Sequence, residues 1–233
     1  MNSENSTPES VPVFWYDVPH GYLPLDVSPT AESLDDLAAQ IRALPENVRD
    51  QADQVFRLYA IVIWELQKNR VQGCALGMHP DGDGEPTTSV LTLFSVNTNG
   101  ASPKATLTTL MSGGFGDSAE SGFVPLELPC GLGFRAETVR AAPAPRQPPA
   151  GSDQPAVEQV WQGMVAIPDA RSSSIIVVQL VTASVDLADD YRNVLQGVAR
   201  TVSFTDPTRG DAGGEEDGPM PGSAAEAVRN DFG

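Results

Sequence analysis

The residues best suited to cation binding form an acidic cluster between two strand-like stretches. His79 and the segment Asp81–Glu85 place acidic side chains at alternate positions, separated by glycine. This is the spacing that begins an EF-hand calcium loop. Such a loop also needs glycine at its sixth position and glutamate at its twelfth, and counting from Asp81 these positions hold Pro86 and Thr92. The cluster therefore predicts a solvated turn, and we expect no metal and no cofactor.

A nucleophilic thiol would require a cysteine beside one of the two histidines, His20 and His79, because an imidazolium lowers the pKa of a thiol. Cys74 stands among apolar strand residues, and Cys130 stands between a proline and a glycine at the entry of a strand. Both are predicted to be structural thiols, with Cys130 the more exposed. Two cysteines do not make a disulfide framework, which is typical of a reducing cytoplasm.

No other motif predicts an enzyme. Gly113–Gly116 has the composition of a phosphate-binding loop, but no Lys-Ser or Lys-Thr pair follows it. The chain contains no Gly-x-Ser-x-Gly, Cys-x-x-Cys or His-Glu-x-x-His motif and no dinucleotide-binding fingerprint. We therefore predict that the protein is not an enzyme.

The charge of the chain restricts its partners. Fourteen basic and 31 acidic residues give a net charge of −17, which repels nucleic acid and anionic membrane surfaces and favours a basic protein partner. The first ten residues lack the basic and apolar parts of a signal peptide. The longest apolar stretch, Leu58–Trp64, is far shorter than the roughly 20 residues that cross a bilayer. These features predict a cytoplasmic protein that binds neither membrane nor nucleic acid.

Four segments have helical character. Ser33 is expected to cap a short helix that ends near Leu44. Pro45 suits the first position of a second helix, whose apolar residues recur in steps of three and four up to Leu66. Pro103–Met111 and Leu187–Val198 predict a short helix and a final amphipathic helix.

Alternating and β-branched residues predict the strands. The pairs are Val71–Met78 with Thr88–Val96, and Val157–Ile167 with Ser174–Thr182, and each pair flanks a turn-like segment. Leu132–Val139 alternates, with Arg135 and Glu137 on a face expected to be solvated. Ile175–Val181 is apolar on both faces, so both must be covered. We therefore predict an α+β fold, a three-layer αβα sandwich with helices on both sides of a twisted, mostly antiparallel sheet.

The composition divides the chain into one domain and two ends. Residues 1–10 are polar and are predicted to be a disordered lead, and residues 207–233 are rich in Gly, Ala, Pro and acid and are predicted to be an acidic disordered tail. The single domain spans residues 11–206. The proline-rich segment 141–155 is predicted to be an extended loop inside this domain.

The order of these elements resembles the PsbP-like αβα sandwich superfamily, which includes photosystem accessory proteins, a Mog-type nuclear-transport cofactor and LpqN-type actinobacterial lipoproteins. The resemblance covers Val11–Asp206 and is carried by the Pro19–Tyr22 turn and the closing Thr201–Phe204 strand. The chain also looks similar to uncharacterised actinobacterial cytoplasmic proteins with a Leu-Pro-x-x-Val-Arg helix, here Leu44–Arg49. The resemblance implies a non-catalytic adaptor or accessory role.

The sequence thus predicts a non-catalytic accessory module that binds a protein through a sheet edge or an inter-layer groove. The expected contact zone comprises the aromatic opening segment and the loop around residues 113–121, namely Phe14, Trp15, Tyr16, His20, Tyr22 and Phe115. Two alternatives remain open. One is a small-molecule-binding protein or enzyme that uses the same groove, and the other is a chaperone-like accessory of a secretion or toxin system.

Overall fold

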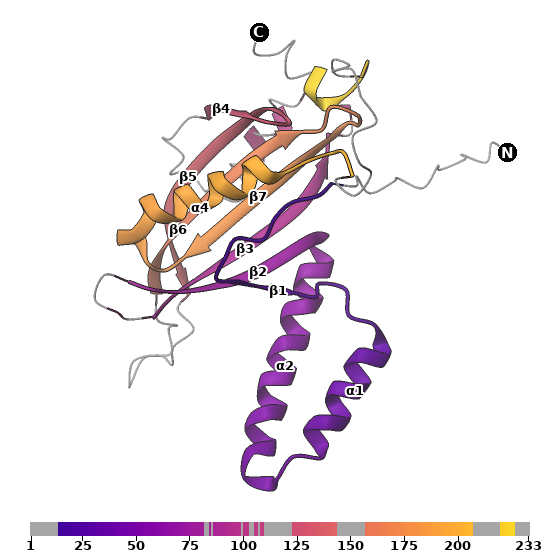
Figure 1. Ribbon diagram of the computed structural model, residues 1–233, viewed down its shortest axis with the longest axis vertical. Helices are drawn as coiled ribbons and strands as arrows, with labels where there is room; N and C mark the ends of the chain where they lie inside the picture. Colours follow the sequence, from indigo (N-terminus) through magenta and orange to yellow (C-terminus); the bar gives the residue numbers. More distant parts are fainter. Residues whose placement is uncertain are drawn as a thin grey trace, which may run out of the picture.

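The computed structural model describes residues 14–81, 84, 86–98, 100–102, 105–106, 108–109, 123–143, 157–206 and 220–226 (Figure 1). Its elements run in the order β1 (Tyr22–Leu25), α1 (Ala31–Arg42), α2 (Glu46–Lys68), β2 (Val71–Pro80), β3 (Pro86–Asn97), β4 (Val124–Leu128), β5 (Gly131–Pro143), β6 (Val157–Pro168), β7 (Ser174–Thr182), a 3-10 turn at Val185–Leu187 and α4 (Ala188–Thr201). Within the described residues, none of the helices combines the length and apolar character that crossing a bilayer requires.

In the part of the chain that the structure describes, the strands form one antiparallel sheet of seven, in the order β1-β2-β3-β7-β6-β5-β4. The two predicted hairpins, β2–β3 and β6–β7, are both present. Strand β7 lies in the middle because it pairs with β3 on one side and with β6 on the other. The predicted α+β class and the antiparallel sheet are therefore confirmed.

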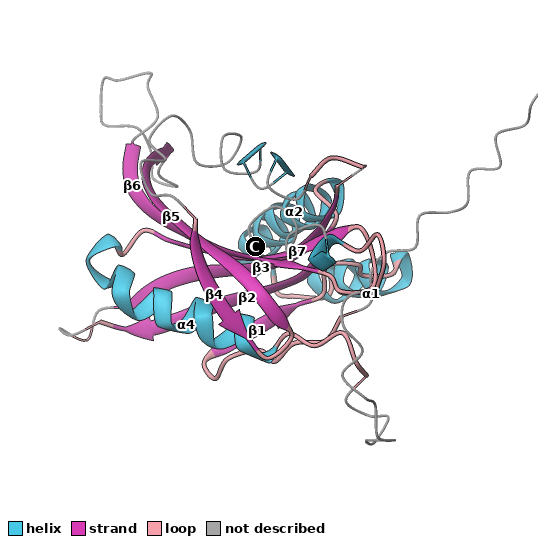
Figure 2. Cartoon of the chain, turned by 90° about the horizontal axis from the view of Figure 1, so that it is seen from above, coloured by secondary structure: helices cyan, strands magenta, loops and turns pink. Residues whose placement is uncertain are grey.

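Helix α4 covers one face of the sheet (Figure 2). Leu195 and Val198 of α4 are buried in the same apolar cluster as Trp161 and Val165 of β6 and Leu180 of β7. Tyr191 adds a polar contact, because its hydroxyl lies 2.8 Å from the Thr87 hydroxyl of β3. The main core of the protein thus lies between α4 and the sheet.

An ionic cluster fastens α4 to β5. The Glu137 carboxylate accepts hydrogen bonds from Arg192 of α4 at 2.6 Å and from the Trp161 indole at 3.3 Å, and it pairs with Arg135 at 3.0 Å. Arg192 also pairs with Asp189, and its hydrogen bond to Glu137 raises the pKa of the guanidinium. The prediction that Arg135 and Glu137 form a solvated face was wrong, because α4 lies over them and leaves both half-buried.

The opposite face of the sheet is covered unevenly. Ile175 and Val177 of β7 are fully buried there, in a cluster with Phe134 of β5 and Met164 of β6, so the prediction that β7 is buried on both faces is confirmed. At the other end of the same face the apolar side chains are exposed. Leu23, Leu76 and Val90 are direct cross-strand neighbours on β1, β2 and β3, and all three are solvent-exposed together with Met78.

The hairpin formed by α1 and α2 extends away from the sheet instead of lying on it (Figure 1). Only Ile63 of α2 is buried. Asn69 and Arg70 connect α2 to β2. Arg70 has a positive φ of 54°, which turns the chain sharply into the strand. The predicted sandwich places these helices against the second face, and the structure does not show that layer.

Two helix starts differ in detail from the prediction. Thr30, not Ser33, caps α1, and its hydroxyl accepts a hydrogen bond from the Ser33 amide at 3.1 Å. Either residue type is a good cap, but Thr30 has the extended backbone that a cap requires. Pro45 directly precedes α2 as its cap residue, one position earlier than expected.

Part of the predicted acidic tail packs on the domain. Residues 220–226 lie against the β6–β7 turn, where the Met220 amide bonds the Ala170 carbonyl at 3.0 Å and the Ala224 amide bonds the Ser172 carbonyl at 2.7 Å. Ala224 is buried, so this stretch is not a free tail. Residues 141–143, predicted to begin the proline-rich loop, instead end strand β5, where they pair with β6. The predicted lead (residues 1–10), residues 144–155 of the proline-rich loop, and residues 207–219 and 227–233 of the tail lie outside the described residues.

Candidate functional site

The structure gives the predicted contact residues different environments. Tyr22 is 6% exposed and belongs to the core under α4. Phe14, Trp15 and Tyr16 are half-buried, while His20 is exposed. Phe115 lies outside the described residues. The structure therefore does not gather these residues into one exposed surface.

The opening segment is bound to the rest of the domain by backbone and side-chain contacts. Trp15 pairs with Ser203 in an antiparallel bridge, with N–O distances of 2.8 and 2.9 Å. The Tyr16 ring occupies the space above Gly73 where a Cβ atom would otherwise be. The Tyr22 hydroxyl lies 2.6 Å from the Ser89 hydroxyl, and burial raises the pKa of Tyr22. These contacts give the aromatic residues a structural role.

The polar clusters noted in the sequence are only partly within the described residues. The His79 ring is tilted against the Tyr22 ring, with the ring centroids 5.2 Å apart, and belongs to the β1–β2 packing. No group of three or more possible metal ligands occurs within the described part of the chain. Residues 82, 83 and 85 of the acidic loop lie outside it.

Both thiols are shielded from solvent. Cys74 is buried and Cys130 is half-buried, and burial raises the pKa of each thiol above its ordinary value. A raised thiol pKa lowers the fraction of the reactive thiolate, about tenfold for each pKa unit. Burial therefore disfavours the thiolate form of both cysteines.

This leads to a reactivity prediction. With a chromogenic disulfide reagent at pH 8, both thiols of the native protein should react at least about tenfold more slowly than free cysteine, with Cys130 faster than Cys74. In urea both should react at the free rate. Separate Cys74→Ser and Cys130→Ser variants assign the two phases, and a native thiol that reacts faster than free cysteine would restore the nucleophile hypothesis.

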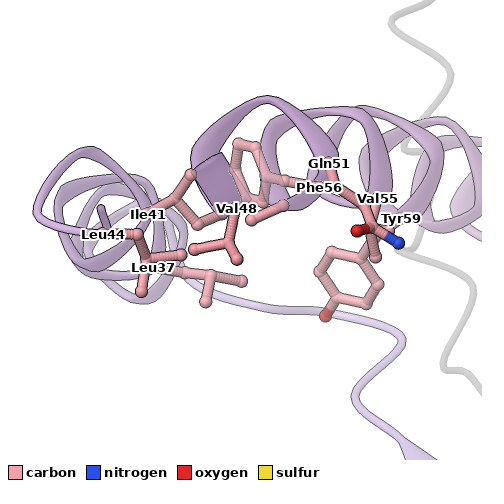
Figure 3. A pocket seen from close by; sticks show the side chains of 9 residues that line it. Leu37, Ile41, Leu44, Val48, Gln51, Val55, Phe56 and Tyr59 are labelled. Atoms are coloured by element: carbon pink, nitrogen blue, oxygen red, sulfur yellow. The ribbon is translucent and has the colours of Figure 1, made fainter. Parts of the chain in front are cut away.

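A concave apolar groove lies between α1 and α2 (Figure 3). Its volume is about 520 Å³. Two polar side chains, Gln51 and Tyr59, lie among otherwise apolar ones. The lining residues are Leu37, Ile41, Leu44, Val48, Gln51, Ala52, Val55, Phe56 and Tyr59.

The sequence builds this groove through helical spacing. Leu37, Ile41 and Leu44 recur in steps of three and four along α1 and into the turn, so they share one face. Val48, Ala52, Val55 and Tyr59 do the same on α2. The turn between the helices is fixed by Arg49, whose guanidinium donates two hydrogen bonds to the Leu44 carbonyl, at 2.8 and 3.2 Å.

The apolar surface continues along α2 beyond the groove. Val55, Leu58, Ile61 and Trp64 are 58 to 62% exposed. Single exposed apolar residues are common, but a contiguous apolar patch on a protein surface marks an interaction site. The hairpin therefore presents an apolar surface that nothing in the described structure covers.

Sequence reasoning missed this site for an identifiable reason. The apolar periodicity of α2 predicts one buried helix face, and the predicted sandwich places that face against the sheet. Periodicity shows which face is apolar but does not name what covers it. Ile61 and Trp64 could have indicated the exposed surface. They lie outside the face formed by Val48–Tyr59, so α2 is apolar on more than the one face that packs on a neighbour.

Comparison of the chain with protein-family models, with curated proteins and with solved structures finds no match. The class is therefore defined by the structure alone: an α+β protein whose described residues form a seven-stranded antiparallel sheet and a projecting helical hairpin. The PsbP-like resemblance stays a prediction.

Proposed function

We propose that the protein is a non-catalytic accessory module that binds another protein through the α1–α2 groove. The observation that carries the proposal is the exposed apolar surface of the hairpin, with Val55 and Leu58 more than 60% exposed. Covering apolar surface contributes about 25 cal/mol for each Å² removed from water, so a partner that fills the groove gains binding free energy there. The adaptor role implied by the PsbP-like resemblance agrees with this proposal.

The sheet edges are less suited to docking than the hairpin. The edge strands β1 and β4 have four and five residues, and each contains a proline, Pro24 or Pro125. Short edges and edge prolines are the features by which proteins avoid strand addition, since proline has no amide hydrogen to donate. A partner that adds a strand is therefore disfavoured at these positions.

We further propose that the exposed end of the second sheet face is covered in the assembled complex. Leu23, Leu76 and Val90 form a row there, and Met78 beside it is 66% exposed. A helical layer over this row would complete the three-layer sandwich expected from the sequence. We place the complex in the cytoplasm, where two shielded thiols stay reduced.

A photocrosslinking amino acid placed at position 55 tests the proposal. In native lysate, a crosslinker at Val55 should yield a discrete protein adduct, and one at Met78 should yield the same partner if it also covers the sheet. A crosslinker at Asn193, exposed on the outer side of α4, is the control. If position 55 gives no more protein adduct than position 193, the proposed function is wrong.

A second candidate is an apolar small molecule. The groove volume of about 520 Å³ lies in the range of small-molecule pockets, roughly 300–1,000 Å³. An organic-solvent extract of the purified protein, examined by mass spectrometry, discriminates between the two. A stoichiometric lipid-like molecule that is lost in a Val55→Glu variant would favour the small molecule over the protein partner.

A further inference from the structure

The shape of the groove fits one helix of limited length. Its α2 lining runs from Val48 to Tyr59, 12 residues or about 18 Å of helix at 1.5 Å per residue. Helix α1, also 12 residues long, forms the other wall. Two paired helices with an apolar groove between them bind a third helix by inserting its apolar side chains at i, i+3, i+4 and i+7. An occupant of about three to four turns fills this length.

The charges on the hairpin favour a basic occupant. Asp53 pairs with Arg57, and Glu65 pairs with Lys68. The other five acidic residues of α1 and α2 are exposed and have no ionic partner within the described part of the chain. They are Glu32, Asp35, Asp36, Glu46 and Asp50.

Few positive charges oppose these acids. The remaining basic residues of the two helices are Arg42 and Arg49, and Arg49 is directed at the Leu44 carbonyl of its own turn. The lining of the groove contains no acidic residue, but the hairpin that carries it has seven acidic and four basic residues. The groove is therefore apolar on a hairpin with excess negative charge, which complements a helix with an apolar stripe between lysines or arginines.

The same charges disfavour other occupants. A second copy of this chain would bring together two hairpins that each carry excess acid, on chains whose net charge is −17, so electrostatic repulsion opposes that pairing. An anionic bilayer is repelled for the same reason.

We propose that the groove binds a basic amphipathic helix of three to four turns, supplied by a partner protein. This inference rests on the proposed function and names the chemistry of its partner. The apolar stripe of that helix packs on Val48, Val55 and Tyr59, and its basic flanks are attracted by the excess negative charge of the hairpin. Apolar contact gives affinity, and charge selects the partner.

Three labelled peptides of 14 residues test the inference on the full chain by fluorescence anisotropy. The first is an amphipathic peptide of leucine and lysine. The second has the same composition in a scrambled order without an apolar stripe, and the third is amphipathic but has glutamate in place of lysine. We expect the first to bind at least about tenfold more tightly than either control at 0.15 M salt, where long-range attraction is largely screened.

Two matched substitutions locate the binding. Val55→Glu places a charge in the groove, whereas Gln54→Glu adds the same charge at an exposed neighbouring position that does not line it. Val55→Glu should weaken binding of the basic peptide at least about tenfold, although it adds a negative charge, and Gln54→Glu should change it less than about twofold. Since Val55 is exposed, circular dichroism should show both variants folded.

A double substitution, Asp36→Asn with Asp50→Asn, lowers the excess negative charge of the hairpin and should weaken binding of the basic peptide about twofold to threefold in total. Equal binding of the scrambled or the acidic peptide, or insensitivity to Val55→Glu, would overturn the inference. So would a concentration-dependent dimer, detected by sedimentation, that Val55→Glu abolishes. These outcomes are independent of the crosslinking at position 55: adducts there without selectivity for the basic peptide reject the basic helix alone, and absence of adducts rejects the proposed function itself.

Discussion

Leu195→Ala should lower the free energy of unfolding by about 3 kcal/mol, whereas Leu58→Ala should change it by less than about 0.5 kcal/mol. Both substitutions remove the same atoms from a helix. Leu195 of α4 is fully buried against the sheet, so its loss leaves a cavity in the core. Leu58 of α2 is 62% exposed, and alanine is at least as good a helix former as leucine.

Urea denaturation followed by far-ultraviolet circular dichroism measures both effects, with Asn193→Ala as the exposed control on α4. The comparison separates two architectures. In a sandwich whose second layer is α2, Leu58 would be buried, and its replacement would cost a few kcal/mol as well. A large loss for Leu58→Ala would therefore show that α2 packs on the sheet in solution, and it would remove the exposed surface on which the proposed function depends.

The strands were predictable because their signal is local. Ile175 to Val178 are apolar at every position, and this pattern requires cover on both faces wherever the strand lies in the fold. The segments that flank Pro168–Ser173 pair directly, so the β6–β7 hairpin follows from the same short stretch of sequence. The capping and spacing of α1 and α2 are also local, and their bounds were predicted within a few residues.

The position of the hairpin was not predictable because it depends on a single turn. Arg70, with its positive φ, sets the direction in which α2 leaves β2, and arginine has no marked preference for that conformation. The aromatic opening segment shows the converse case. The sequence does not distinguish an aromatic residue that binds a partner from one that packs in the core. Only Gly73, which leaves room for the Tyr16 ring, indicates that Tyr16 packs in the core.

A second large loss of stability is expected from a substitution at Gly163, in the middle of β6. A Cβ atom built there would lie 2.8 Å from the Leu195 side chain of α4 and closer still to the Trp161 indole on its own strand. Both neighbours are buried, at 0 and 2% exposure, so neither has free space to move into. Gly163→Ala should therefore cost about 2 kcal/mol by overpacking, although alanine is otherwise acceptable in a strand.

Combining Gly163→Ala with Leu195→Ala should cost at least about 1 kcal/mol less than the sum of the two single losses. The truncated side chain at position 195 leaves the space that the new methyl group needs, so each substitution relieves part of the damage done by the other. Urea denaturation of the wild type, the two single variants and the double variant measures the free energies of the double-mutant cycle. The matched control combines Gly163→Ala with Leu58→Ala, whose losses should be additive. Additivity in the first pair would mean that α4 does not rest on Gly163, and the core between α4 and β6 would then have to be packed differently from the contacts described above.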